Sequence, residues 1–207
     1  FGGSWGSSLA LAYGIEHTER VSGFILRGVF LCSQKELEWF LDGIKAVFPE
    51  NWREFSEFLP AEERADLLGF YHKRLVDPDH QIHEPAARMW ARFEGACSTL
   101  LPSSRSVSEL DSGRASLALA RIEAHYFVND LYLSDDYFID NIDRIRHLPG
   151  TIVQGRYDMV CPIGTADALA KELPEMNYVV VPDAGHSAME PAMRSALVAA
   201  TERFKMR

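Results

Sequence analysis

The sequence predicts an α/β fold in which parallel strands alternate with flanking helices, interrupted by one all-helical insertion. Residues 1–32 and 147–207 carry short apolar runs that alternate with helical segments, a pattern typical of parallel strands joined by right-handed crossovers. Residues 33–146 place their apolar side chains at helical spacing instead. We therefore expect two segments of one core and a helical insertion between them, without an internal repeat.

The chain opens on Gly2-x-Ser4-x-Gly6, which fits the G-x-S-x-G pattern of a nucleophile elbow. A serine whose hydroxyl must stand clear of a strand sits on a strained turn, and small flanking residues let the backbone and the helix pass closely. The residues that follow predict a helix over 4–17, whose N-terminal dipole would favour an oxyanion near Ser4. A glycine-rich turn that only caps a helix is the alternative.

The next segments follow in order along the chain. Residues 21–30 form a short apolar run closed by Gly28, which predicts a buried parallel strand. In the insertion, apolar stripes and proline or acidic starts predict six helices. Their expected ranges are 36–48, 51–59, 60–75, 84–100, 117–129 and 136–145, with a serine-rich loop at 103–112. The α/β pattern then returns, with strands expected at 150–155 and 177–182 and helices at 164–173 and 191–204.

Three residue types suited to nucleophilic catalysis follow strand ends in the order Ser, Asp, His. Ser4 ends the first strand, and Asp158 and His186 lie just past the two strands of the second core segment. Because chemistry in an open α/β sheet gathers at the carboxyl ends of the strands, we expect these residues to meet. Ser4 would attack a carbonyl, His186 would take and return its proton, and Asp158 would hold the imidazole in the correct tautomer. A turn role for Asp158, a loop role for His186, and Asp183 as a weaker rival acid are the alternatives.

Composition narrows the function classes. The 207 residues are 47% hydrophobic and 25% charged, as in ordinary globular domains. A net charge of −9 argues against nucleic acid as a partner, and no apolar run is long enough to span a membrane. The cysteines Cys32, Cys97 and Cys161 are far apart and lack metal-binding spacing, so we expect free thiols in a reducing compartment and no metal or other cofactor.

Longer motifs extend the interpretation. They are G-G-S-W-G-S at 2–7, L-R-G-V-F at 26–30, W-A-R-F-E-G at 90–95, A-R-I-E-A-H-Y-F at 120–127, G-R-Y-D-M-V-C-P at 155–162 and G-H-S-A at 185–188. With these motifs the chain resembles the prolyl iminopeptidases, cytoplasmic serine peptidases of the α/β-hydrolase class. The resemblance covers nearly the whole chain. It implies the C-terminal part of an α/β-hydrolase fold with an all-helical cap, and release of N-terminal proline from peptides.

The resemblance also implies roles for two acids in the insertion. Glu94 and Glu123 match glutamates that bind the free imino group of the substrate. Two carboxylates around a secondary ammonium would supply charge-assisted hydrogen bonds and would reject blocked N-termini. Arg27, at the end of a buried strand, would steady one of these acids. Solvated helix residues that form i, i+4 pairs are the alternative.

Further residues complete the expected substrate site. The backbone N–H of Trp5, the residue after the nucleophile, is the expected oxyanion donor. Phe30, Phe40, Val160 and Cys161 are candidates for the wall of an apolar pocket that holds the pyrrolidine ring, with core packing as the alternative for Phe40.

The chain departs from the family at its start. It begins at Phe1 without the upstream H-G-G-P-G segment that supplies a second oxyanion donor in the family, so we expect a fragment. Missing strands would expose apolar surface, so the piece made alone is expected to be inactive or insoluble. The favoured function is a serine exopeptidase. A carboxylesterase of the same fold and a non-catalytic binding protein remain alternatives, and the oligomeric state is left open.

Overall fold

The computed structural model describes residues 1–102 and 113–205 and divides the chain into two compact units. We call Phe1–Glu36, Ser98–Leu100 and Ser134–Arg207 the core unit, and Leu37–Cys97 with Leu101–Leu133 the helical unit. The serine-rich loop predicted at 103–112 lies outside the described residues. We retain 33–146 as the proposed limits of the insertion.

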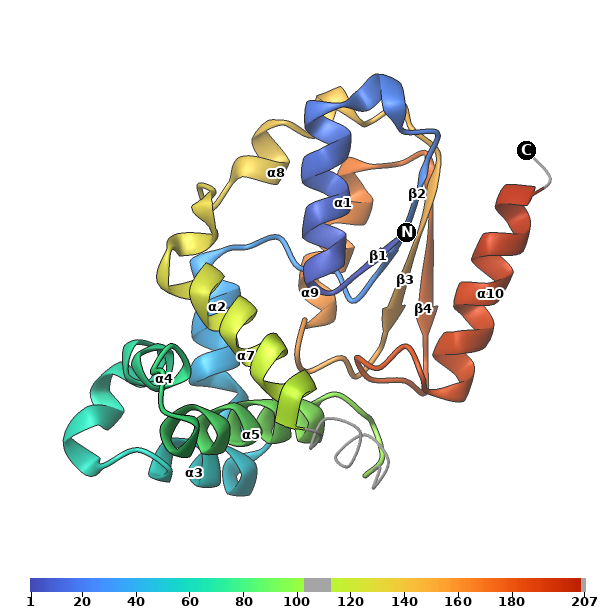
Figure 1. The fold of residues 1–207 in the computed structure, drawn as a ribbon. Helices are drawn as coiled ribbons and strands as arrows, with labels where there is room; N and C mark the ends of the chain where they lie inside the picture. The colour runs from blue at the N-terminus through green and yellow to red at the C-terminus, as the bar shows by residue number, and fades with distance from the viewer. Residues whose placement is uncertain (103–112, 206–207) are drawn as a thin grey trace. The chain divides into compact units, whose positions relative to one another are not determined.

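The core unit is built on a sheet of four parallel strands in the order β1-β2-β3-β4 (Figure 1). Gly3 pairs with Arg27, and Arg27 pairs with Val153, so the carboxyl ends of the first three strands lie along one edge. This arrangement confirms the predicted α/β class. The strands are β1 (Gly2–Gly3), β2 (Phe24–Arg27), β3 (Gly150–Gly155) and β4 (Met176–Val181).

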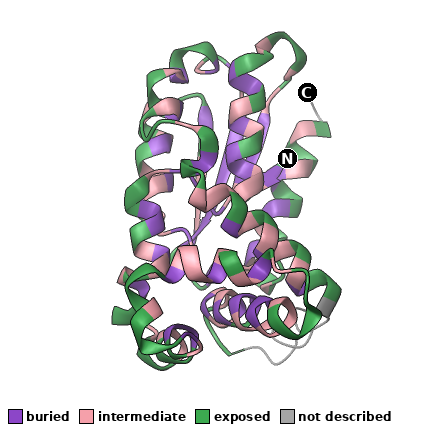
Figure 2. Cartoon of the chain, turned by 60° about the vertical axis from the view of Figure 1, so that its left-hand side comes forward, coloured by how far each residue is buried: buried purple, intermediate pink, exposed green. Residues whose placement is uncertain are grey.

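Helices cover both faces of this sheet. In Figure 1, α1 (Trp5–Glu16) and α9 (Ile163–Glu172) lie on one side and α10 (Pro191–Lys205) lies on the other. Successive strand side chains point to opposite faces. Accordingly, Ile25 belongs to the buried cluster that includes residues of α10, whereas the ring of Phe24 approaches Gly14 of α1. Strand β3 is buried along its whole length and β2 is buried up to Leu26, whereas most of β4 is partly exposed (Figure 2). The core of this unit therefore sits on both faces of the sheet.

Strand β2 is shorter than the predicted run of residues 21–30. It ends at Arg27 because Gly28 has a φ of 53°, in the left-handed region that glycine tolerates. Beyond it, the Val29 N–H donates to Gln154 Oε1 at 3.1 Å and the Phe30 N–H donates to Ser7 Oγ at 3.1 Å. Side chains thus take over the hydrogen bonds that a longer ladder would have made.

In the described part of the helical unit, the regular secondary structure consists of α-helices and 3-10 helices. These helices pack around aromatic rings. Phe55 stacks on Tyr71 and on Phe93, each with ring centroids 4.4 Å apart, and Trp90 is fully buried beside them. Among the described residues, no helix combines the length and apolar character needed to cross a membrane. The helices are α2 (Gln34–Leu41), which begins in the core unit, α3 (Pro49–Glu57), α4 (Leu67–Leu75), α5 (His80–Cys97) and α7 (Gly113–Val128).

Three predicted helices are broken into shorter pieces. Helix α2 ends at Leu41 and a 3-10 turn follows, and the helix expected at 136–145 is reduced to α8 (Tyr137–Asp140) and a second 3-10 turn. The helix expected at 60–75 begins as a 3-10 helix. There the Asp66 carboxylate accepts the Gly69 N–H at 2.9 Å, which caps the start of a separate α-helix, α4.

Candidate active site

Ser4 occupies a strained turn between β1 and α1. Its φ of 56° and ψ of −127° are unusual for a residue with a side chain. A Cβ atom on Gly2 would lie 2.0 Å from the Gly6 carbonyl oxygen, so only glycine fits there. The Ser4 N–H donates to the Arg27 carbonyl at 2.8 Å, and Ser7 Oγ donates to the Ser4 carbonyl at 2.7 Å. The geometry therefore requires the glycine at position 2, whereas a Cβ atom on Gly6 would meet nothing within 4 Å.

The structure brings His186 and Asp158 together. His186 Nδ1 lies 2.9 Å from Asp158 Oδ2 and 3.0 Å from Oδ1, and both side chains are buried. Asp158 also accepts hydrogen bonds from Gln154 Nε2 at 3.0 Å and from the Cys161 N–H at 2.8 Å. A buried carboxylate needs such donors, and these fix its orientation toward the imidazole.

Backbone contacts hold the loop that carries His186. The N–H groups of His186 and Ser187 both donate to the Ser98 carbonyl, at 2.9 and 2.8 Å. On the other side, a Cβ atom on Gly28 would lie 2.8 Å from His186 Cε1 and 2.9 Å from Nδ1. The glycine after β2 therefore leaves the space in which the imidazole packs.

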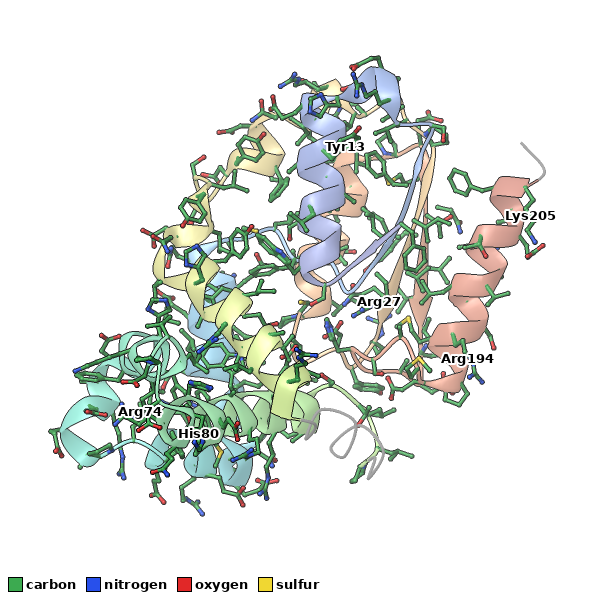
Figure 3. All side chains as sticks on the ribbon, in the orientation of Figure 1. Tyr13, Arg27, Arg74, His80, Arg194 and Lys205 are labelled. Carbon is green, nitrogen blue, oxygen red and sulfur yellow. The ribbon has the colours of Figure 1, made fainter. Side chains whose placement is uncertain are left out.

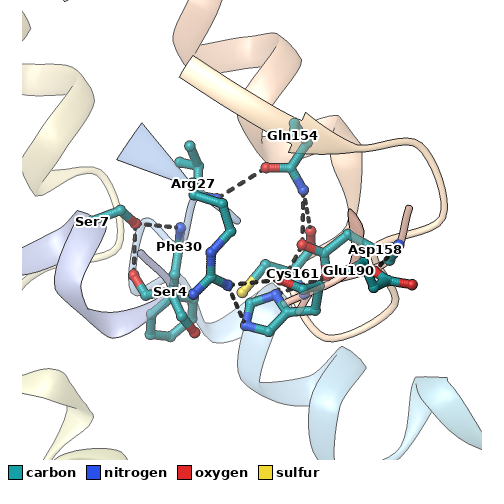
Figure 4. A network of polar contacts seen from close by, with 11 residues as sticks. Ser4, Ser7, Arg27, Phe30, Gln154, Asp158, Cys161 and Glu190 are labelled. Atoms are coloured by element: carbon teal, nitrogen blue, oxygen red, sulfur yellow. Dashed lines mark hydrogen bonds and ion pairs between the residues drawn. The ribbon is translucent and has the colours of Figure 1, made fainter. Parts of the chain in front are cut away.

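The guanidinium of Arg27 forms a hydrogen bond with Nε2, the second ring nitrogen of His186. Arg27 Nη1 lies 3.0 Å from His186 Nε2 and donates to the His186 carbonyl at 2.9 Å. Because a guanidinium can only donate, Nε2 is the acceptor, and the ring proton resides on Nδ1, facing Asp158. This is the tautomer that a general base needs. Figure 3 shows Arg27 projecting from the end of β2, and Figure 4 shows it in one polar network with Ser4 and Asp158.

The thiol of Cys161 belongs to the same loop as Asp158. Burial, and then the nearby Asp158 carboxylate, raise the pKa of this thiol well above its usual range. Among the contacts of the described residues, none joins Ser4 Oγ to His186 Nε2. The structure thus pairs the predicted acid with the predicted base, and places Arg27 on the atom that a catalytic serine would use.

The remaining predicted site residues of the core unit are Trp5, Phe30, Val160 and Cys161. Trp5 is the first residue of α1, and its ring centroid lies 6.4 Å from that of Phe30. Phe30 and Cys161 are buried, whereas Val160, in the loop before α9, is partly exposed.

The helical unit contains the predicted pair of acids. Glu94 on α5 and Glu123 on α7 are both partly buried. Burial, the charge of Glu94 and a hydrogen bond to Glu94 raise the pKa of Glu123 well above its usual range. Trp90 Nε1 donates to Glu123 Oε2 at 2.7 Å. Burial and the neighbouring Glu94 carboxyl group therefore both oppose ionisation of Glu123.

Phe40 packs within the aromatic cluster of the same unit. It is buried, and its ring centroid lies 5.6 Å from that of Phe93 and 6.1 Å from those of Trp90 and Phe127.

Comparison with known proteins identifies the family. Residues 1–192 match the family described as alpha/beta hydrolase fold. The chain belongs to the α/β-hydrolase family. Solved structures of other hydrolases share the fold. An esterase from Exiguobacterium antarcticum has a TM-score of 0.61 at 16% identity, and covers 99% of this chain and 65% of its own. A putative lipase from Acinetobacter baumannii has a TM-score of 0.59 at 13% identity. The match covers 99% of this chain and 59% of the lipase chain.

Curated relatives are closer in sequence. The chain is 48% identical over 206 residues to a probable proline iminopeptidase of Leptolyngbya boryana, covering 99% of this chain and 64% of the relative. It is 47% identical over 208 residues to a proline iminopeptidase of Arabidopsis thaliana, and this match covers 99% of this chain and 55% of the relative. The chain therefore spans less than two thirds of the length of these relatives. The resemblance predicted from the motifs is confirmed.

Sequence reasoning missed three residues that organise this α/β-hydrolase site. Gln154 is fully buried and bonds Asp158, and Ser7 bonds the elbow. Glu36 is buried, and its carboxylate accepts hydrogen bonds from the N–H groups of Leu31 and Ser33. These bonds hold the loop after β2. Burial raises the pKa of Glu36. The available signal for Gln154 was an amide inside an otherwise apolar strand.

Proposed function

We propose that this chain belongs to a serine exopeptidase that releases N-terminal proline from peptides. The carrying observation is the buried hydrogen bond between His186 and Asp158, on the same sheet edge as the strained Ser4 turn. Similarity to proline iminopeptidases of two organisms supports proline as the released residue.

The proposed chemistry proceeds through an acyl-enzyme. Ser4 Oγ attacks the carbonyl carbon of the N-terminal residue while His186 Nε2 accepts its proton. The resulting imidazolium is stabilised by Asp158, and the oxyanion accepts a hydrogen bond from the Trp5 N–H at the helix N-terminus. His186 then protonates the leaving amine, and water, activated by the same imidazole, hydrolyses the ester on Ser4.

This route requires one exchange of partner. His186 Nε2 must release the Arg27 N–H before it can accept the Ser4 proton. A side-chain rotation would be sufficient, because the backbone of the elbow and of the His186 loop is already held by hydrogen bonds.

Recognition of the substrate would draw on the acid pair of the helical unit. Approach of a secondary ammonium would favour the ionised form of Glu123, and would so counteract the burial and the Glu94 charge that raise its pKa. The ammonium would then be held by two carboxylates. We also propose that an apolar wall contacts the pyrrolidine ring. The three cysteines are free and buried, which supports a cytoplasmic location. The proposed substrate-contacting residues beyond the acids are Arg27, Phe30, Phe40, Val160 and Cys161.

The test uses the full-length protein and three substrates. We expect hydrolysis of a proline arylamide, little hydrolysis of its N-acetylated form, and loss of activity in Ser4→Ala. Ser195→Ala, which changes an exposed serine on α10, is the matched control and should behave like wild type. Turnover of a simple acyl ester without turnover of proline arylamide would assign a carboxylesterase instead. Absence of fluorophosphonate labelling at Ser4 would refute a serine hydrolase of either kind.

A further inference from the structure

Gln154 is a neutral amide buried in the middle of the sheet. It is the penultimate residue of β3, and its exposed fraction is 0%. Burying an amide is unfavourable unless its polar atoms find partners, so such a residue in a strand indicates a specific set of hydrogen bonds.

Its side chain forms three hydrogen bonds, to two backbone groups and one side chain, and these partners lie in two loops. Oε1 accepts the Val29 N–H at 3.1 Å, from the loop after β2. Nε2 donates to Asp158 Oδ2 at 3.0 Å and to the Cys161 carbonyl at 2.9 Å, both in the loop after β3 (Figure 4). Both ends of the amide are therefore used, and the three bonds also distinguish its oxygen from its nitrogen.

The bond to Asp158 has a geometric consequence. Oδ1 of Asp158 accepts the Cys161 N–H at 2.8 Å while Oδ2 accepts Gln154 Nε2. With each oxygen held by a separate donor, the carboxylate cannot rotate about its last bond. It then presents both oxygens to His186 Nδ1, at 3.0 and 2.9 Å.

We propose that Gln154 is a positioning residue that, through Asp158, fixes the ring orientation and tautomer of His186. This inference rests on the proposed function, because it assumes that His186 is the base that activates Ser4. The alternative is a purely structural role, in which the amide only ties the loop after β2 to the loop after β3.

A glutamate at this position offers a sharp comparison. Protonated, it has the shape of glutamine and can donate to Asp158. Ionised, it would place a second carboxylate against Asp158 and lose the donor. Burial and a neighbouring carboxylate both favour the protonated form, so the substitution should act like glutamine at low pH and fail as the pH rises. The described charged or titratable groups around the pair are His186, which contacts Asp158, Arg27 at His186 Nε2, Cys161, and Glu36, whose charge acts on Cys161.

The experiment compares Gln154→Met, Gln154→Glu and the control Thr151→Val in the full-length protein. Thr151 lies on the same strand and is also buried, so its variant is a control for changes in strand packing. One readout is the rate at which a fluorophosphonate labels Ser4 as a function of pH, which needs no proline subsite. The other is the nitrogen NMR spectrum of the His186 ring, which reports the tautomer without any reaction. Thermal melting shows whether each variant is folded.

We expect Gln154→Met to lower the labelling rate about 10- to 100-fold at every pH and to raise the share of the other imidazole tautomer. Gln154→Glu should approach the wild-type rate at low pH and show an additional alkaline loss. A Gln154→Met rate within about twofold of wild type would overturn the proposal, as would a Gln154→Glu profile parallel to wild type. If Gln154→Met does not fold, the Gln154→Glu profile decides alone. A wild-type chain that is not labelled would refute the proposed function, while the NMR tautomer would still decide on Gln154.

Discussion

Removing the guanidinium of Arg27 should increase the reactivity of Ser4. Arg27 Nη1 donates to His186 Nε2 at 3.0 Å, so the general base is occupied until this bond breaks. A hydrogen bond to a charged group contributes about 1.5–3 kcal/mol, and partial exposure of Arg27 reduces this to about 1–2 kcal/mol. By the exponential relation between barrier and rate, Arg27→Met should therefore speed labelling about 5- to 30-fold.

The assay is fluorophosphonate labelling of the full-length protein, followed under pseudo-first-order conditions. Hydrolysis of proline arylamide should change in the opposite direction, because the proposed substrate site loses one of its residues. Arg156→Met, which removes an exposed arginine of the core unit, should leave both rates near wild type. Labelling that is unchanged or slower in Arg27→Met would refute the reasoning that Arg27 competes with Ser4 for Nε2.

Three further substitutions test the two sites. Asp158→Asn should lower proline arylamide turnover by roughly 10³- to 10⁴-fold, because an amide favours the wrong imidazole tautomer; a loss below tenfold would contradict this. Gly28→Ala should lower the free energy of unfolding by about 1–2 kcal/mol and slow turnover, because its φ is 53° and its Cβ would meet His186. Gly164→Ala, with nothing within 4 Å, is the control and should be neutral or stabilising. Since folding raises the pKa of Glu123, ionisation destabilises the folded state as the pH rises. Glu123→Gln should therefore melt higher than wild type at pH 8, with the difference shrinking toward pH 4; a constant difference would contradict this assignment.

The spacing of the motifs was sufficient to predict which strand ends carry Ser4, Asp158 and His186. Strand ends align in a parallel sheet whatever the intervening length, so the contact of His186 with Asp158 could be anticipated. The partner of Nε2 could not, because it depends on a long side chain. Gly3 leaves room for the Arg27 guanidinium, because a Cβ atom on Gly3 would lie 2.6 Å from Arg27 Nη2.

The length of β2 shows a second limit of sequence reasoning. Residues 21–30 are apolar enough to continue as strand, and the local pattern contains no stop before Gly28. The strand ends before Gly28, whose φ is 53°, and beyond it Gln154 and Ser7, distant in sequence, take the N–H groups of Val29 and Phe30. An amide within an apolar strand marks Gln154 as unusual, but the local sequence does not show which distant backbone groups it bonds.

The central claim is that Ser4 becomes covalently linked to the residue released from a peptide. The most direct measurement is mass spectrometry of the full-length protein, acid-quenched during turnover of a proline ester. We predict a prolyl group on the peptide that contains Ser4, absent in Ser4→Ala. A substrate that turns over while this peptide stays unmodified, or a prolyl group on another residue, would contradict the account.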